Sequence, residues 1–180
     1  MNKFDQIYRY FGYIKKLCIV IASVAIAVMV LLITIDVLSR NLLNNGIAGS
    51  YEIVESILMP TAIFWALLVT YSSGSIPRID LVTEKFSGNI KLILGILLIA
   101  IDIFIYGLLT YYSWSRAEIA LSSGASISAG GNLINIAPIF LFVPLGFLLV
   151  TLEAIFILLK MILDKKYHYY IDPDNEPMKE

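Results

Sequence analysis

Charged residues, cysteine and histidine are scarce in this sequence. Asp, Glu, Lys and Arg make up 15% of the 180 residues, whereas about 25% is typical of a soluble domain. The single cysteine, Cys18, excludes an intramolecular disulfide and membrane redox chemistry that needs a cysteine pair. The single histidine, His168, excludes a haem held between two histidines. The sequence also has no basic tract of the kind that binds nucleic acid, so no nucleic-acid partner is predicted.

Hydrophobic residues, by contrast, are abundant and occur in long runs. They make up 59% of the chain, the mean hydropathy is +0.83, and the charges cluster between the runs. About 20 apolar residues cross a bilayer as a helix. We therefore predict an all-α membrane protein with four transmembrane helices, at residues 17–43, 51–71, 90–114 and 133–163. The last run would be about 46 Å long as a helix, so its first part is expected to lie outside the hydrocarbon.

The first apolar run also has two features of a signal peptide, because Lys15 and Lys16 precede it and Ala25-Ile26-Ala27 resembles a cleavage site. The apolar region of a signal peptide has only about 7–15 residues. This run continues well beyond that length, which predicts a retained membrane helix.

Three flanking segments complete the predicted domain organisation. Residues 1–16 place apolar and aromatic side chains on one helical face, which predicts an amphipathic helix in the membrane interface, with a disordered flank as the alternative. In the polar connector 72–91 apolar residues recur at helical spacing, which indicates either a second interfacial helix or an ordinary solvated loop. Residues 164–180 are charged and contain two prolines, which predicts a flexible tail. The four-helix domain therefore extends over residues 17–163.

The distribution of basic residues predicts the orientation. Of the 13 Lys and Arg residues, only Arg40 and Arg116 lie on the side of the first and third connections. The other 11 lie in the two terminal flanks and the second connection, which share one side of the membrane if there are four spans. Because cytoplasmic segments carry the excess of Lys and Arg, both termini are predicted to be cytoplasmic.

Four charged residues lie around the first turn between spans: Asp36, Arg40, Glu52 and Glu55. Asp36 and Arg40 are four residues apart and therefore share a face of a helix, as do the two glutamates. Charged residues at the edge of hydrocarbon usually pair or serve a function. Our hypothesis is a polar cluster that fastens the first two spans, with Arg40 paired to one of the three carboxylates, and that marks a working surface.

Two further carboxylates, Asp102 and Glu153, lie within predicted spans and are expected to face protein, not lipid. For Asp102 a structural hydrogen bond is favoured over a functional role, and Glu153 is interpreted as a partner for a neighbouring helix. The sequence contains no metal-ligand cluster, nucleophile pair or nucleotide loop. We therefore predict neither an enzyme nor a cofactor or metal site, and a subunit in preference to a pump.

Four short motifs resemble one known family, the small (Q-type, DctQ-like) permease subunit of tripartite ATP-independent periplasmic (TRAP) transporters. Asp-Val-Leu-Ser-Arg at 36–40 is similar to the family's Asp-Val-x-x-Arg, and Gly49 with the glutamates after it resembles its Gly-x-x-Glu. Arg78 and Asp80 match the Arg-Val-Asp of its cytoplasmic connector, and Pro-Leu-Gly-Phe at 144–147 resembles its Pro-x-Gly-Phe. One departure is that a His often found before the connector motif is absent here. The likeness covers roughly residues 15–163.

The resemblance implies a role in sodium-driven import of an organic acid, of the sialic acid or C4-dicarboxylate type, across the bacterial inner membrane. In that family a large multi-span permease subunit carries substrate, and a periplasmic substrate-binding protein delivers it. The small subunit packs on the scaffold of the large one and stabilises it among the membrane lipids. The resemblance therefore implies no substrate pocket in this chain, and contacts with the binding protein are expected at the turns 44–50 and 122–132.

Three alternatives remain from the residues themselves. A self-sufficient four-helix exporter acting as a homodimer would need a mid-depth Glu in its first span, and that span is uncharged before Asp36. A membrane scaffold protein without a transport role is opposed only by the family motifs. An intramembrane enzyme has the least support, for want of suitable residues.

Overall fold

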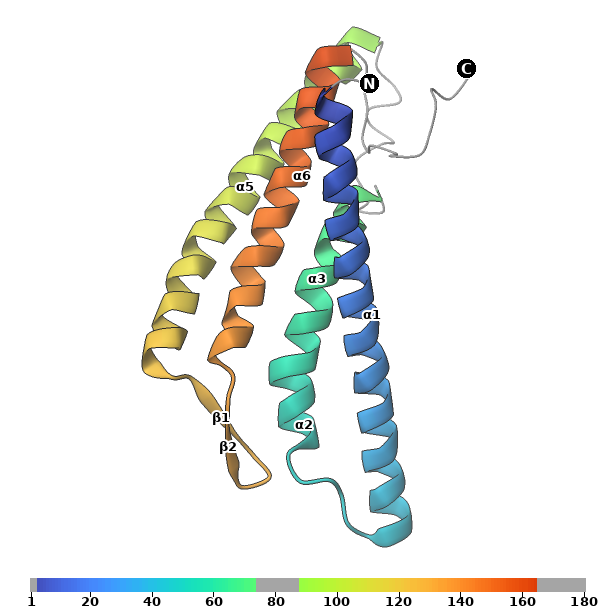
Figure 1. The fold of residues 1–180 in the computed structure, drawn as a ribbon, viewed down its shortest axis with the longest axis vertical. Coiled ribbons are helices and arrows are strands. Elements are labelled where there is room, and N and C mark those ends of the chain that lie inside the picture. Colours follow the sequence, from blue (N-terminus) through green and yellow to red (C-terminus); the bar gives the residue numbers. More distant parts are fainter. Residues whose placement is uncertain (1–2, 74–87, 165–180) are drawn as a thin grey trace.

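The computed structural model describes residues 3–73 and 88–164, and helices dominate it (Figure 1). The long helical elements are α1 (Lys3–Leu43), α3 (Met59–Ser72), α5 (Gly88–Ser123) and α6 (Phe142–Asp164). The shorter elements are α2 (Ser50–Ile53), a π-helical turn (Val54–Leu58), β1 (Ser126–Ala129), β2 (Asn132–Asn135) and a 3₁₀ helix (Ala137–Leu141).

Among the described residues four helical segments are long and apolar enough to cross a membrane, as predicted. They extend over Ile7–Leu43, Ser50–Ser72, Ile90–Ser123 and Ala137–Leu163. Successive spans run in opposite directions, so α1 begins and α6 ends at the same end of the molecule (Figure 1).

The first boundary prediction differs from the structure, because residues before Leu17 do not form a separate helix. α1 continues without a break from Lys3 to Leu43. The apolar face assigned to the membrane interface packs on α6 instead: Tyr8 and Phe11 are both buried, and their rings contact Phe156 at centroid distances of 5.7 and 5.4 Å. Packing against α6 therefore holds these residues in the same continuous helix as the first span.

The predicted start of the fourth span, at residue 133, is also too early, because this crossing begins at Ala137. Residues 126–135 form an antiparallel β-hairpin, in which Ala129 pairs with Asn132 across a two-residue turn. Gly130 and Gly131 both have positive φ, at 59° and 86°, as a tight hairpin turn requires. The chain is therefore mainly helical but not all-α. The preceding helix, predicted to end near residue 114, extends to Ser123.

Two predicted segments lie outside the described residues. These are most of the connector 72–91, with Arg78 and Asp80, and the tail after Asp164. The interfacial helix of the connector and the flexible tail therefore stay predictions.

The second crossing is interrupted where the sequence places Pro60. Proline has no N–H with which to continue the helical hydrogen bonds, and the π-helical turn Val54–Leu58 directly precedes this position. Thr61 Oγ1 donates a hydrogen bond to the carbonyl oxygen of Ile57 at 2.6 Å, so its side chain satisfies a backbone acceptor in the disturbed region. The helix therefore continues across the interruption, and the Ile57 carbonyl oxygen keeps a hydrogen-bond donor.

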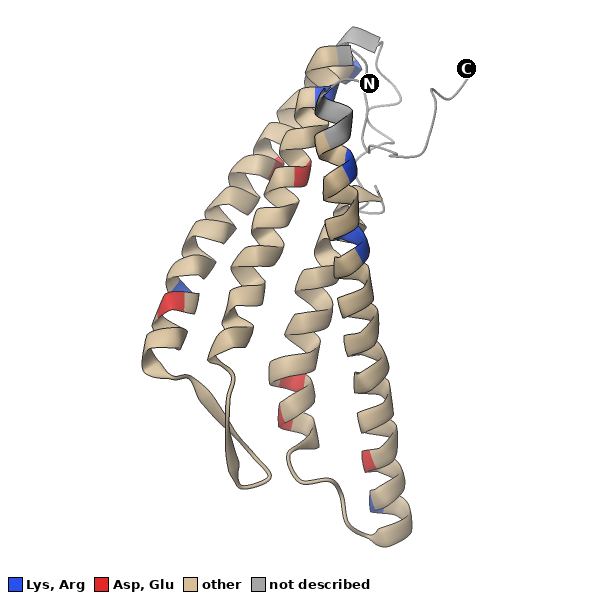
Figure 2. Cartoon of the chain, viewed as in Figure 1, with Lys and Arg blue, Asp and Glu red and all other residues tan. Residues whose placement is uncertain are grey.

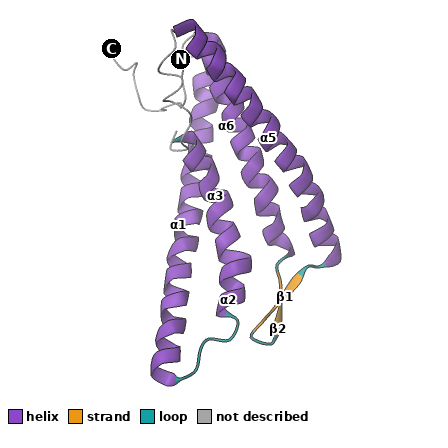
Figure 3. Cartoon of the chain, turned by 180° about the vertical axis from the view of Figure 1, so that it is seen from behind, coloured by secondary structure: helices purple, strands orange, loops and turns teal. Residues whose placement is uncertain are grey.

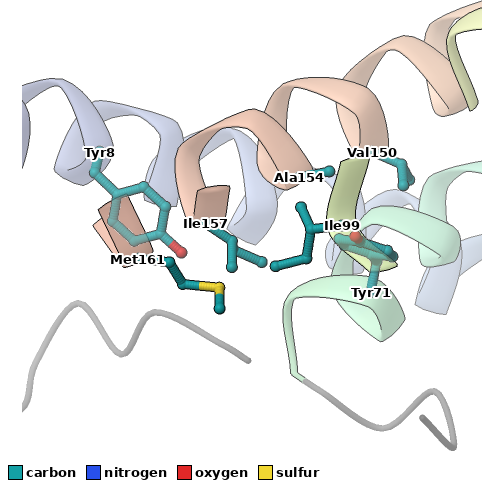
Figure 4. Packing of buried hydrophobic residues seen from close by; sticks show 7 residues of the cluster. All are labelled: Tyr8, Tyr71, Ile99, Val150, Ala154, Ile157 and Met161. Carbon is teal, nitrogen blue, oxygen red and sulfur yellow. The ribbon is translucent and has the colours of Figure 1, made fainter. Parts of the chain in front are cut away.

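The helices contact one another in the order α1, α3, α6, α5. They converge at the end where α1 begins, and the α1–α3 and α5–α6 pairs diverge toward the other end (Figures 1 and 3). The larger buried cluster brings together all of these helices (Figure 4) and contains Tyr8, Tyr71, Ile99, Val150, Ala154, Ile157 and Met161. A second cluster contains Phe11, Cys18 and Leu68, so the single cysteine is a packed core residue.

The connections at the diverging end touch each other. A Cβ added to Gly49, which has φ 86°, would lie 2.7 Å from the backbone of Ala129, and one added to Gly130 would lie 2.7 Å from the carbonyl oxygen of Ala48. The turn between the first two spans and the tip of the hairpin therefore pack backbone to backbone. This contact joins the two helix pairs where they are otherwise apart.

Candidate functional site

The end of α1 is tied to the following turn by Asp36, which is 8% exposed. One carboxylate oxygen, Oδ2, lies 3.0 Å from Arg40 Nη2, one helical turn later. The other, Oδ1, accepts a hydrogen bond from the backbone N–H of Ile47 at 2.7 Å. One carboxylate therefore serves both a neighbouring cation and the backbone of the turn.

Backbone geometry and small residues complete this turn. Asn44 has φ 51°, the left-handed conformation that Asn tolerates well. The Ser39 hydroxyl donates to the carbonyl oxygen of Asn45 at 2.5 Å. The Arg40 side chain lies over Gly46, where an added Cβ would come within 2.7 Å of Nε. Arg40 is thus positioned by the turn as well as by Asp36.

The two glutamates of the predicted cluster are placed differently. Glu52 lines the same shallow hollow as Arg40, together with residues 46–51, but forms no ion pair with it among the described residues. Glu55 lies on the π-helical turn with its side chain exposed. Of the three carboxylates considered for Arg40, the structure pairs it with Asp36.

Glu153 occupies a separate site between α1 and α6 and has no exposed surface. Its Oε1 accepts hydrogen bonds from Lys15 Nζ at 2.8 Å and from the Tyr8 hydroxyl at 2.9 Å. Lys15 also donates to the Tyr8 oxygen at 2.6 Å and lies 4.4 Å from the centre of its ring. The second carboxylate oxygen, Oε2, is buried and has no hydrogen-bond partner in the part of the chain that the structure describes.

The partners of Glu153 were not found by sequence reasoning. Lys15 was assigned to the basic flank before the first span, and Tyr8 to the membrane interface. Their separation of seven residues places both on one face of a helix, and this was the available signal. It could not show that this face meets Glu153, which follows Lys15 by 138 residues.

Asp102 joins α5 to α3. The hydroxyl of Tyr71, which is 1% exposed, donates to Asp102 Oδ2 at 2.9 Å. The Tyr71 ring also meets the Tyr106 ring edge to face at a centroid distance of 5.8 Å. Asp102, which was expected to face protein, therefore bonds a neighbouring helix.

Three carboxylates share one pattern, because each of them bonds another part of the same chain. Asp36 bonds the first turn, Asp102 bonds α3 and Glu153 bonds α1. Over residues 3–73 and 88–164 no group of three or more His, Cys, Asp or Glu side chains could hold a metal ion. The fold and its polar contacts define a multi-pass membrane protein whose internal polar groups fasten its own helices.

Comparison with known families identifies the class further. The family model described as tripartite ATP-independent periplasmic transporters, DctQ component, matches residues 29–164. Since the match covers more than half of the chain, the protein belongs to this family, and the resemblance inferred from the short motifs is confirmed. It is a small membrane subunit of a TRAP transporter, a transport system that also has a large permease subunit and a binding protein. No curated protein sequence matches the chain.

Proposed function

We propose that this chain is the small subunit of a sodium-driven TRAP transporter that imports an organic acid, of the sialic acid or C4-dicarboxylate type, across the bacterial inner membrane. In this proposal it packs on the scaffold of the large permease subunit and stabilises it. The observation that supports the proposal best is the match of residues 29–164 to the DctQ family model. The chain also exposes large apolar side chains on α1 and α3, including Leu31, Met59 and Ile63, and a partner subunit can cover this surface.

The internal polar contacts support a scaffold role. A carrier needs polar groups free to bind and release substrate or ions near mid-membrane. Asp102 and Glu153 are instead bonded to Tyr71 and Lys15 of neighbouring helices. Groups held in this way stabilise one arrangement of helices, as a static companion to a moving subunit requires.

The orientation follows from the basic residues. Most Lys and Arg residues of the described helices lie toward the end where α1 begins (Figure 2). By the positive-inside rule this end faces the cytoplasm. The turn at 44–50 and the hairpin then face the periplasm, where we propose that they help to dock the binding protein. Leu133, which is 78% exposed on the hairpin, is a candidate contact.

Purification of the tagged chain from native membranes in mild detergent tests this function. The expected result is a large multi-span protein at one-to-one stoichiometry, with substrate uptake in reconstituted vesicles that requires both subunits. The same uncovered surface could be covered by a second copy of this chain. A homodimer without a large partner would therefore contradict the proposal and favour the four-helix exporter, and full uptake by the large subunit alone would also contradict it.

A further inference from the structure

Glu55 is a charged residue that takes part in none of the contacts described above. Its side chain is exposed, and it forms no ion pair or side-chain hydrogen bond among the described residues. In contrast, Asp36, Asp102 and Glu153 all accept hydrogen bonds from elsewhere in the chain. Glu55 is therefore a carboxylate within a membrane-crossing segment that has no described internal partner.

The depth of Glu55 makes this exposure costly. Its crossing, Ser50–Ser72, has 23 residues and is about 34 Å long at 1.5 Å per residue, close to the hydrocarbon thickness of about 30 Å. Glu55 lies five residues into this crossing, about 7 Å from its start. Near this edge of the hydrocarbon a carboxylate that faces lipid costs less than at mid-membrane, but pairing with a cation still lowers its free energy. A cation from outside the chain is therefore expected beside it.

Glu55 belongs to an exposed stripe formed by Tyr51, Glu55, Met59 and Ile63. The three other members are 69%, 47% and 56% exposed. The residues between them are buried or half-buried, because this crossing packs between α1 and α6. The stripe is therefore the narrow exposed face of a helix that is otherwise covered by α1 and α6. It carries one negative charge near its periplasmic end and apolar side chains deeper in the crossing.

The π-helical turn Val54–Leu58 favours the alignment of this stripe. In a regular α-helix residues four apart are offset by about 40°, so a four-residue stripe drifts around the axis. Hydrogen bonds from i to i+5 underwind the helix, and such turns occur frequently at functional sites. The interruption before Pro60 thus keeps Glu55 closer in line with Met59 and Ile63.

From this arrangement we infer that the stripe is a docking face for a transmembrane helix of the large permease subunit. That helix carries a Lys or Arg near its periplasmic end, and this cation pairs with Glu55. The inference rests on the proposed function and adds the contact face and the charge of the partner. A soluble binding protein does not reach Met59 and Ile63, which lie deeper in the crossing than Glu55.

Photocrosslinking in the intact transporter tests the face. A photoreactive amino acid at Met59 or Ile63 is expected to give a covalent product with the large subunit. Phe104, which is 67% exposed on the outer helix α5, is the matched control and is expected to give none. Products of Met59 and Ile63 with lipid alone, or with a second copy of this chain, would overturn the inference.

Charge reversal tests the ion pair. Glu55→Arg is expected to reduce the co-purified large subunit about tenfold, within the range for loss of an interhelical polar contact, and Glu55→Gln is expected to reduce it less. The control is Glu118→Arg, which changes an exposed carboxylate near the Ser123 end of α5. This variant is expected to leave the complex intact. A reversed charge at the crosslinked basic residue of the large subunit should restore binding to Glu55→Arg.

Two controls separate the possible failures. The yield and melting temperature of Glu55→Arg expressed alone should match those of the unmodified chain, because Glu55 has no described internal partner. If the unmodified chain binds no large subunit, the proposed function fails. If it does bind, but Glu55→Arg binds equally well, only the docking face is wrong.

Discussion

Lys15 on α1 and Glu153 on α6 form an ion pair at 2.8 Å inside the membrane-crossing part of the protein. Glu153 has no exposed surface and the Lys15 side chain is 15% exposed. The pair joins the first and last helices, which are the most distant in the sequence. It therefore closes the helix arrangement at the end where α1 begins.

Removing one partner of this pair should destabilise the protein strongly. Lys15→Met leaves the Glu153 carboxylate buried without its cation, which typically costs about 3 kcal/mol or more. The double variant Lys15→Met/Glu153→Leu removes both charges and is expected to recover most of the loss. Thermal unfolding in detergent measures both, with Lys16→Met, at an exposed neighbouring position, as the control. Equal stability of Lys15→Met and Lys16→Met would contradict the role of the pair.

Substitutions at Asp36 and Arg40 should have unequal effects. Asp36→Ala removes the acceptor for the N–H of Ile47 as well as the ion pair, whereas Arg40→Ala removes only an ion pair whose guanidinium side chain is 62% exposed. Exposed pairs contribute little to stability. We expect a clear fall in melting temperature for Asp36→Ala, a smaller fall for Asp36→Asn and almost none for Arg40→Ala.

Transport measurements on Arg40→Ala then test the working-surface hypothesis. A loss of uptake at unchanged stability would indicate that Arg40 contacts another component. Normal uptake would limit the residue to a minor structural role in the turn.

Gly146 allows close approach of α6 to α3. A Cβ at this position would lie 2.8 Å from the Phe64 carbonyl oxygen, a backbone atom that cannot move aside alone. Gly146→Ala should therefore separate the helices and cost about 1–3 kcal/mol, as overpacking of a core does. Gly107→Ala is the matched control, because a Cβ there has no neighbour within 4 Å. Melting temperatures that fall equally for the two variants would refute the packing argument.

Asp102 should act as a hydrogen-bond acceptor and not as a group that carries substrate or ions. Asp102→Asn keeps an oxygen that can accept from Tyr71, so near-normal uptake is expected, while Asp102→Leu should lower subunit stability by about 1–2 kcal/mol. Uptake assays and unfolding on the same preparations separate the two effects. Loss of uptake in a fully assembled Asp102→Asn complex would show that the ionised carboxylate takes part in transport.

Accessibility of single cysteines tests the orientation. With Cys18 replaced by Ala, a membrane-impermeant thiol reagent added from the periplasmic side should label Leu133→Cys on the hairpin. The same reagent should label Arg9→Cys, at an exposed position near the start of α1, only after the membrane is permeabilised. The reverse pattern would overturn the assignment of both termini to the cytoplasm.

Local sequence patterns were enough to predict the spans and to limit the partner of Arg40 to three carboxylates. Hydropathy is a property of consecutive residues, so the four crossings were found even though three boundaries moved. The spacing of Asp36 and Arg40 placed them on one helical face, where they do form an ion pair. The hairpin at 126–135 was missed because two four-residue strands give a weak pattern, although Gly130-Gly131 was a usable turn signal.

The sequence by itself determined the membrane class, the number of crossings, the expected orientation and the family motifs, because each depends on local composition and short-range spacing. The tertiary structure alone decided that residues 3–16 continue α1, that Glu153 meets Lys15 and Tyr8, and that Glu55 stays without a described partner. These outcomes depend on which faces of distant helices meet. Tyr8 and Glu153 are 145 residues apart, and no local pattern specifies a contact over that separation.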